Sequence, residues 1–215
     1  IYAVTGTLNM ADLALKVSQV PAEDLVLLHA GATLLLLVFA VKAALVPVHF
    51  WLVGTYANAP APVAALFAIM TKVGAYSIIR VYTLIFGAGA GDSAWLAEPW
   101  LLPVALVTLV VGSIGVLAAA SLGRLVGFAV IGSMGTLMVA VAGFTPQSLS
   151  AALYYLLHST VAAAALFMIV GLVRERRGRH GDFIVATVRF RDSEVLSVLF
   201  FLAAIAMVGL PPLSG

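Results

Sequence analysis

Two lysines lie inside long apolar stretches of the sequence. Lys42 stands in LLLLVFAVKAALVPVHFWL and Lys72 stands in PVAALFAIMTKVGAYSIIR. A lysine at the centre of a membrane-spanning helix costs at least about 2.5–3.5 kcal/mol on insertion scales. A lysine at such a position is therefore a candidate functional group. The alternative is a side chain that extends to the headgroups or is paired only for packing.

The two lysines are predicted to lie at similar depths. At ~1.5 Å per residue, Lys42 lies roughly 16 Å from the end of its stretch near Val53, and Lys72 roughly 18 Å from the start of its own near Pro60. A short turn joins the two stretches, so they run antiparallel and both lysines are expected near the bilayer midplane. Two ammonium groups at one depth repel each other, which favours the neutral form of at least one. A lysine that can be neutral can load and release a proton.

Pro47 predicts a break in the first of these helices. It follows Lys42 by five residues, has no N–H, and its ring crowds the carbonyl of Ala43. A freed carbonyl in a membrane must be buried in protein or hydrated, and transporters place ion sites beside such unwound turns. A simple proline kink is the alternative. The last apolar stretch contains GLPPLSG, where Pro211 and Pro212 predict a second interruption, as an inverted repeat would produce.

Three histidines and one arginine are further candidates. His158 lies well inside LYYLLHSTVAAAALF, and an unperturbed histidine titrates near pH ~6.5, which suits a proton relay. The alternative is a neutral histidine bonded to a neighbouring helix. His49 and His29 lie near opposite ends of the first stretch and could line a hydrated access route, although packing or interface roles are favoured. Arg80, two turns beyond Lys72, is expected to be an interfacial anchor rather than an ion ligand.

The composition excludes several classes of protein. Hydrophobic residues make up 63% of the sequence and charged residues 9%, and the mean hydropathy is +1.16. An ordinary soluble domain is about a quarter charged, and a disordered chain needs low hydrophobicity. The sequence has no cysteine, which excludes a disulfide scaffold and cysteine-ligated iron–sulfur or zinc sites. We predict no metal site, no cofactor and no nucleic-acid partner.

Six stretches carry almost no charge, and each is near or above the roughly 20 residues that span a bilayer core. They run near 25–53, 61–86, 101–120, 125–143, 149–173 and 195–213, the last reaching the C-terminus at 215. Because apolar residues are continuous rather than alternating, the stretches favour helices over a β-barrel. We predict one all-α membrane domain over 1–215, a polytopic helical bundle in the lipid bilayer. Glycines in GSIG (112–115) and GSMG (132–135) are expected to allow close helix packing.

The placement of charge predicts the orientation. The segment Arg174–Glu194 carries six arginines, so the positive-inside rule places it in the cytoplasm. The loop 87–100 contains two acidic residues and no lysine or arginine, and falls outside. An anionic-lipid or partner site is the alternative reading of the arginines. The sequence lacks an initiator methionine and polar tails, so we expect an internal fragment of a longer polytopic protein.

The run from Lys42 to Arg80 resembles the antiporter-like membrane subunits of respiratory complex I, membrane-bound hydrogenases and multisubunit Mrp cation/proton antiporters. Their pattern is a lysine, a proline five residues later, His/Tyr-x-Trp-Leu, an Ala-Pro turn and a second lysine about 30 residues downstream. The sequence matches it with Lys42, Pro47, HFWL at 49–52, AP at 59–60 and Lys72. TGTLNMADLA (5–14), ALYYLLHSTVAAAALF (152–167) and FLAAIAMVGLPPLSG (201–215) resemble the D-type branch of the Mrp Na⁺/H⁺ antiporter subunits.

The resemblance implies a fourteen-helix fold with two inverted five-helix repeats, of which this chain would form helices seven to twelve. It implies proton-carrying roles for Lys42, Lys72 and His158. It also implies a glutamate partner for Lys42 and a further charge on helix twelve, both outside this chain. The implied partners are other subunits of a membrane antiporter complex, the transported ions are protons and Na⁺ or K⁺, and the location is the bacterial plasma (inner) membrane.

Three hypotheses for the function follow. The leading one is a proton-translocating subunit of a monovalent cation (Na⁺ or K⁺)/proton antiporter, which is a transporter subunit and not an enzyme. The alternative is a pump module of complex I or a hydrogenase. Val53 departs from a pattern frequent in the family, and Ala162–Ala165 and Phe128–Val130 depart from patterns frequent in complex I members. These departures argue against the redox-driven branch. The third hypothesis, a non-transporting scaffold, is disfavoured by the two lysines and the predicted break.

Overall fold

The protein is an all-helical bundle in the computed structural model, which describes residues 1–186, 189–190 and 192–210. Its longer helices are α3 (Leu25–Lys42), α4 (Phe50–Asn58), α5 (Ala61–Leu84), α6 (Glu98–Leu117), α7 (Leu122–Val141), α8 (Pro146–Arg177) and α9 (Ser193–Val208). The short helices are α1 (Tyr2–Thr5) and α2 (Met10–Lys16), with single 3₁₀ turns η1 (Val17–Gln19), η2 (Gly91–Ser93) and η3 (Gly178–His180).

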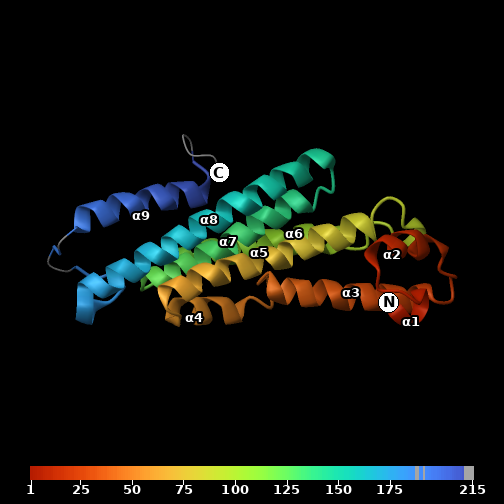
Figure 1. Cartoon of the computed structure of the whole chain (residues 1–215), viewed down its shortest axis with the longest axis horizontal. Coiled ribbons are helices and arrows are strands. Elements are labelled where there is room, and N and C mark those ends of the chain that lie inside the picture. The colour runs from red at the N-terminus through yellow and green to blue at the C-terminus, as the bar shows by residue number, and fades with distance from the viewer. Residues whose placement is uncertain (187–188, 191, 211–215) are drawn as a thin grey trace.

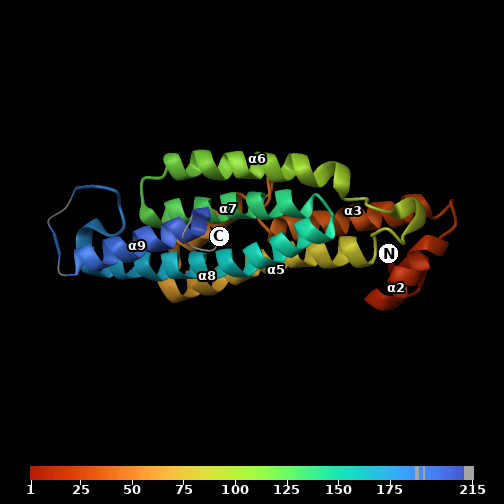
Figure 2. The same cartoon turned by 90° about the horizontal axis from the view of Figure 1, so that it is seen from above.

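The long helices lie side by side along the long axis of the molecule (Figure 1). α3 and α4 follow one another along one edge, α9 lies along the opposite edge, and α1 and α2 lie at the end near the N-terminus. Viewed from above, α6 is outermost and packs on α7 (Figure 2). α5, α7 and α8 contact one another and form the centre of the bundle, which contains Lys72.

Five of the described helices are long and apolar enough to cross a membrane: α3, α5, α6 with the η2 turn, α7 and α8. The predicted all-α membrane bundle is therefore the fold observed. Six spans were predicted; the described residues contain these five and α9, an apolar helix of 16 residues that is shorter than the other five, so the count of six stays a prediction. The last predicted span continued to 213, but Pro211 and Pro212 lie outside the described residues.

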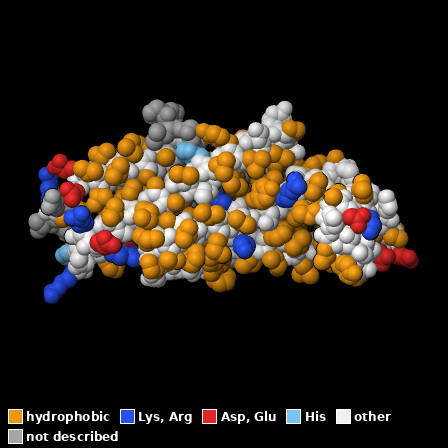
Figure 3. All heavy atoms as spheres, viewed as in Figure 1, with side chains coloured by type: hydrophobic (Ala, Val, Ile, Leu, Met, Phe, Trp, Pro, Cys, Tyr) orange, Lys and Arg blue, Asp and Glu red, His pale blue; other side chains and the backbone are white. Residues whose placement is uncertain are grey.

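The surface also fits a lipid or protein environment. In Figure 3, hydrophobic side chains cover most of the length of the visible face, and acidic side chains gather at its two ends. Large apolar side chains such as Val26, Leu34 and Val38 on α3 are exposed. Soluble monomers rarely expose continuous apolar patches of more than a few hundred Å². The exposed apolar faces of this bundle are therefore suited to contact with lipid or with further helices.

Polar residues and glycine mark the ends of the helices. Thr145 accepts a hydrogen bond from Ser148 N–H, Ser148 Oγ accepts one from Thr145 N–H, and Pro146 is the first residue of α8. α9 ends at Gly209, whose φ of 79° is in the left-handed region that favours glycine. The helix therefore ends before Pro211 and Pro212, the predicted place of the interruption, which lie outside the described residues.

Glycines bring α6 and α7 into backbone contact. A Cβ on Gly112 would overlap the backbone of Gly132, and a Cβ on Gly135 would lie 2.5 Å from Leu109 N. A real Cβ does not approach other atoms that closely. The close packing expected from GSIG and GSMG is therefore confirmed, and it fixes the position of α7 next to α6.

A partly buried ion pair joins the ends of three helices. Arg174 Nη2 lies 3.2 Å from Asp182 Oδ2 and donates a 2.8 Å hydrogen bond to Ala57 O, at the end of α4. The same Asp182 oxygen accepts a 2.8 Å bond from Gly123 N–H, at the start of α7. Burial raises the pKa of Asp182, but the Gly123 and Arg174 hydrogen bonds outweigh burial and hold this pKa below its usual range. We call these four residues the Arg174–Asp182 cluster.

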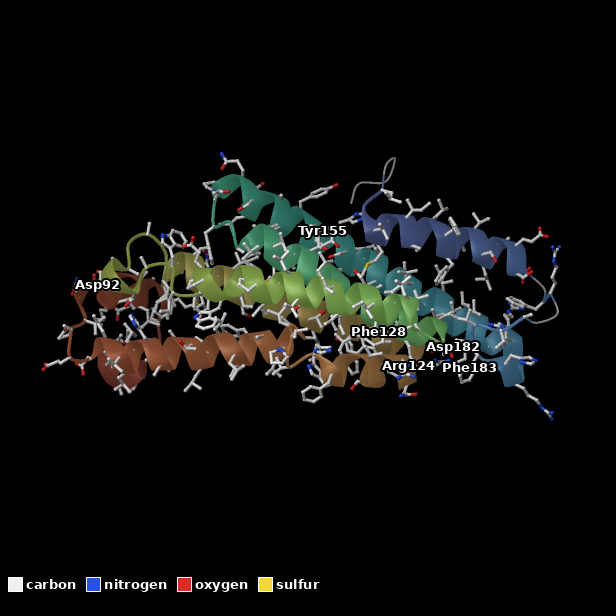
Figure 4. The ribbon with its side chains drawn as sticks, turned by 180° about the vertical axis from the view of Figure 1, so that it is seen from behind. Asp92, Arg124, Phe128, Tyr155, Asp182 and Phe183 are labelled. Carbon is white, nitrogen blue, oxygen red and sulfur yellow. The ribbon has the colours of Figure 1, made fainter. Side chains whose placement is uncertain are left out.

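Backbone contacts place this cluster at one end of the bundle. Leu122 N–H donates to Asp182 O at 2.9 Å, and Ile184 N–H donates to Ala120 O at 3.0 Å. Figure 4 shows Asp182 and Phe183 close to Arg124 at this end, with Asp92 at the other. The segment after α8 is thereby fixed against the start of α7.

The α6–α7 contact predicts opposite effects for two glycines that face each other. Gly112→Ala is expected to lower the free energy of unfolding by about 1–3 kcal/mol because the new methyl group overlaps the backbone of α7. Gly132→Ala is expected to be neutral or to stabilise the helix by up to about 1 kcal/mol, because its Cβ would make only an ordinary 3.9 Å contact. Unfolding in detergent micelles, followed by circular dichroism, measures both, and equal losses would contradict the packing described.

The Arg174–Asp182 cluster predicts a pH-dependent stability. Because the folded-state pKa of Asp182 is lowered, its contribution is complete above the unfolded value of about 4 and is lost as pH falls through the folded value. Asp182→Asn is expected to lower the free energy of unfolding by about 1–2 kcal/mol at neutral pH, with the difference narrowing below pH ~4. Thermal unfolding of purified protein between pH 3 and 7 measures this.

Asp12→Asn is the matched control, because Asp12 pairs with Lys16 on the exposed face of α2 and such pairs contribute little. A stability difference between wild type and Asp182→Asn that is constant across this pH range would contradict the role of the ionised carboxylate.

Candidate functional site

Lys42 is the last residue of α3, at the point where the predicted break occurs. The chain leaves the helical conformation at Ala44, whose φ is 53°, and helical structure resumes at Phe50. The interruption covers residues 43–49. Pro47 was expected to free a single backbone carbonyl, so the interruption is longer than predicted. Lys42 is exposed on the surface of the chain.

Hydrogen bonds from α4 and α6 help to hold this interrupted segment. Trp51 Nε1 donates to Val41 O at 3.0 Å, which joins α4 to the last turn of α3. Val46 N–H donates to Thr108 Oγ1 at 3.0 Å, and the Thr108 hydroxyl donates to Val104 O at 2.6 Å. Thr108 is fully buried in α6. The break is therefore a defined structure that α4 and α6 both support.

Lys72 is buried in the centre of the bundle with 2% of its surface exposed. Its Nζ donates a 2.8 Å hydrogen bond to Ser133 Oγ of α7, and Ser133 donates a 2.8 Å bond to Val130 O. Within the described part of the chain, no carboxylate forms an ion pair with Lys72. A buried amine whose polar contact is a neutral hydroxyl is costly to keep charged, which is unusual for a purely structural lysine.

The two lysines lie at the same level of the bundle. A Cβ on Gly74 of α5, two residues after Lys72, would lie 2.7 Å from Ala43 N and 2.9 Å from the carbonyl carbon of Lys42. The end of α3 therefore packs directly on the backbone of α5. The structure brings the two lysine-bearing backbones together but gives the side chains different surroundings, since Lys72 is buried and Lys42 is exposed.

His158 lies on α8 and contacts α9 rather than Lys72. Its Nε2 donates a 2.8 Å hydrogen bond to Ala206 O, in the last turn of α9 before Gly209. A groove of about 480 Å³ runs beside this contact and is lined by His158 and mostly apolar residues of α8 and α9. His158 therefore supports the C-terminal end of α9.

The remaining candidates lie apart from Lys72. His29 Nε2 is hydrogen-bonded to Ser93 Oγ at 3.0 Å, beside the η2 turn. His49 precedes α4, and its Nδ1 is buried without a hydrogen-bond partner among the described residues. Arg80 is exposed on α5. None of these three side chains shares a hydrogen bond with Lys42 or Lys72 in the part of the chain that the structure describes.

The hydroxyl partners are not evident from the sequence. Ser133 stands out there only as part of the packing motif GSMG, and Thr108 does not stand out at all. Ser133 also lines a groove of about 570 Å³ between α6, α7, α8 and α9, together with Thr136 and Tyr155; Figure 4 shows Tyr155 on α8. A hydroxyl residue inside an apolar stretch is the sequence signal that could have indicated these partners. The sequence does not show which helix such a residue faces.

The chain is similar to known proteins over its whole length. The family model described as "NADH:quinone oxidoreductase/Mrp antiporter, TM" matches residues 1–215. The chain is 40% identical to the D-type subunit of a probable K⁺/H⁺ antiporter from Rhizobium meliloti, and 40% identical to the D-type subunit of a Na⁺/H⁺ antiporter from Bacillus subtilis. Each match covers 100% of this chain, which spans 43% and 42% of the lengths of these relatives.

Three solved structures share the fold over 98% of this chain. A chain of the Mrp complex from Dietzia sp. DQ12-45-1b has a TM-score of 0.79 at 31% identity, with 38% of that chain covered. A chain of an archaeal membrane-bound sulfane sulfur reductase has a TM-score of 0.86 at 26% identity, with 42% covered. A chain of respiratory complex I from Thermus thermophilus has a TM-score of 0.79 at 28% identity, with 44% covered.

The hydrogen bond from Val46 to Thr108 predicts that Thr108 stabilises the interrupted segment. Thr108→Val keeps the shape of the side chain but removes the acceptor, so amide hydrogen exchange over 43–49 is expected to become about tenfold faster, the equivalent of one net hydrogen bond. Mass spectrometry of protein in lipid nanodiscs measures the exchange. Ser113→Ala is the control, because the Ser113 hydroxyl donates to Leu109 O of its own helix and to no other described residue. Unchanged exchange in Thr108→Val would contradict this role.

Proposed function

Because this chain belongs to the NADH:quinone oxidoreductase/Mrp antiporter transmembrane family, we propose that it forms the proton-conducting part of a membrane subunit of a monovalent cation/proton antiporter. The observation that carries the proposal is the pair of lysines on packed helices. The amine of Lys72 is buried beside a hydroxyl, and Lys42 ends a broken helix at the same level. A non-transporting scaffold would need neither the buried amine of Lys72 nor a lysine at the end of a broken helix.

The relatives favour the antiporter branch over the redox-driven branch. The relatives from Rhizobium meliloti and Bacillus subtilis carry antiporter names at 40% identity, whereas the complex I chain is 28% identical. Their names specify K⁺ in one case and Na⁺ in the other, so the proposal includes either ion. The absence of a lysine at Ala162–Ala165 agrees with this choice.

In the proposed mechanism the two lysines exchange protons with water in the surrounding membrane domain. Lys42 lies at the C-terminal end of α3. Repulsion between ammonium groups on packed helices opposes a second proton on Lys72, so loading one site promotes release from the other. A membrane potential supplies about 2.3 kcal/mol per charge per 100 mV to drive the movement.

We further propose that the chain forms a single membrane domain over 1–215. This domain is part of a fourteen-helix subunit of the bacterial plasma membrane, which associates with other antiporter subunits. The segment Arg174–Glu194 faces the cytoplasm, and His158 continues the relay at the end of α9. His49, His29 and Arg80 have access or anchoring roles. The 98% coverage of this chain by chains from the Mrp complex and complex I structures supports an assembly with partner subunits.

A pump module of a redox complex is the second candidate. The TM-score of 0.86 with the sulfane sulfur reductase chain favours it. The two candidates share the proton chemistry but differ in the source of energy. Purification of the complete complex distinguishes them, because only a redox module co-purifies with flavin or iron–sulfur subunits.

Replacing either lysine tests the proposed function. Lys42→Ala and Lys72→Ala, in the complete protein with its partner subunits, are each expected to reduce Na⁺- or K⁺-dependent proton exchange at least tenfold because each removes a titratable site. A pH-sensitive dye in everted membrane vesicles measures the exchange, and immunoblotting measures assembly.

Lys16→Ala is the matched control, because Lys16 is exposed on α2 and, among the described residues, forms an ion pair only with Asp12 of the same helix. Wild-type exchange in both Lys42→Ala and Lys72→Ala would refute the proposed relay. Exchange that stops equally in Lys16→Ala would show that the effect is not specific to the site.

A further inference from the structure

We propose that Ser133 is a positioning residue that sets the proton affinity of Lys72 through the hydrogen bond between its hydroxyl and the lysine amine. This inference rests on the proposed function, since it concerns the same proton site. It adds a residue of α7 that the sequence pattern of the two lysines does not include.

The geometry of the contact is specific. Lys72 is 2% exposed and Ser133 5% exposed, and they lie 61 residues apart on packed helices. The Lys72 Nζ–Ser133 Oγ distance is 2.8 Å, and the Ser133 Oγ–Val130 O distance is also 2.8 Å. The Ser133 hydroxyl therefore has two partners. Val130 O can only accept a hydrogen bond, whereas the role of Lys72 Nζ depends on whether the lysine is protonated.

The serine hydroxyl can satisfy both states of the lysine. A charged ammonium has three donors and no acceptor, so Ser133 accepts from Nζ and its own hydrogen points to Val130 O. A neutral amine has a lone pair, so the hydroxyl can rotate and donate to Nζ instead. The proton that moves is the lysine's, and the serine keeps its own hydrogen in both states. Because the bond to the charged form is charge-assisted and the stronger of the two, Ser133 favours the protonated lysine.

Several other titratable groups on the helices packed against α5 have hydrogen-bond or ion-pair partners of their own. His158 donates to Ala206 O, and the Tyr56 hydroxyl donates to Phe67 O. Asp12 pairs with Lys16, and Arg174 pairs with Asp182. Besides Lys72, the titratable and charged side chains on these helices and on α5 itself are Asp12 and Lys16 of α2, His29 and Lys42 of α3, Tyr56 of α4, Tyr76, Arg80 and Tyr82 of α5, Arg124 of α7, and Tyr154, Tyr155, His158, Arg174, Glu175, Arg176 and Arg177 of α8.

Lys42 is the charged group whose helix end packs on α5 next to Lys72. It acts on the same proton by repulsion, whereas Ser133 acts by direct bonding. The two effects are separable, because Lys42 approaches from α3 and Ser133 from α7.

The test is the pH profile of cation-dependent proton exchange in vesicles that contain the complete antiporter. Ser133→Ala removes the acceptor for the ammonium, so the pH of half-maximal exchange is expected to move about one unit lower. Ser133→Thr keeps the hydroxyl and is expected to keep the wild-type profile. Ser113→Ala is the control, because Ser113 lines the same groove but, within the described part of the chain, its hydroxyl bonds only to Leu109 O of its own helix.

A wild-type pH profile in assembled Ser133→Ala overturns the inference, as does an equal shift in Ser113→Ala. If Ser133→Ala does not assemble, Ser133→Cys replaces it, because a thiol fills the space but is a weak acceptor; a shift in the same direction supports the inference and an unchanged profile overturns it. Absence of exchange in the wild-type complex would instead refute the proposed function, so the two failures are distinguishable.

Discussion

The structure depends on keeping one lysine amine inside a helical bundle. Lys72 is buried, and its amine contacts a neutral hydroxyl rather than a carboxylate among the described residues. An isolated charge in such a place is expensive, and removing the charge instead leaves an amine that still needs a hydrogen-bond partner. Ser133 meets this need in both states. The packing of α7 and α3 against α5 brings Ser133 to one side of α5 and the end of α3 to the other.

Small residues make this arrangement possible. Gly112 and Gly132 bring α6 and α7 into backbone contact, and Gly74 allows the end of α3 to pack directly on α5. Helices in a membrane gain little from the hydrophobic effect, so close van der Waals contact between backbones contributes much of their association. The same close contact that stabilises the bundle also sets the separation between the lysine-bearing helices.

The polar groups freed by the interruption of α3 are also satisfied by distant residues. Thr108 of α6 accepts from Val46, and Trp51 of α4 donates to Val41. At the other end of the described chain, His158 of α8 donates to Ala206 in the last turn of α9. Irregular backbone within a membrane must have such partners. A neighbouring helix thus supports both the interruption after α3 and the C-terminal end of α9, which is a reason for side chains of these types to occur in apolar segments.

The sequence by itself determined the apolar stretches, the two lysines within them, the break near Pro47, the end of α9 near Gly209 and the family resemblance, because hydropathy and helix breaking are local properties of the chain. Only the tertiary structure decided that the interruption extends over 43–49, that Ser133 faces Lys72 and Thr108 faces Val46, and that His158 contacts α9 instead of Lys72. These partners lie 61, 62 and 48 residues apart. Which side chains meet over such separations depends on the rotation and axial position of each helix, and these are set by packing contacts such as those of Gly74 and Gly112 rather than by local sequence.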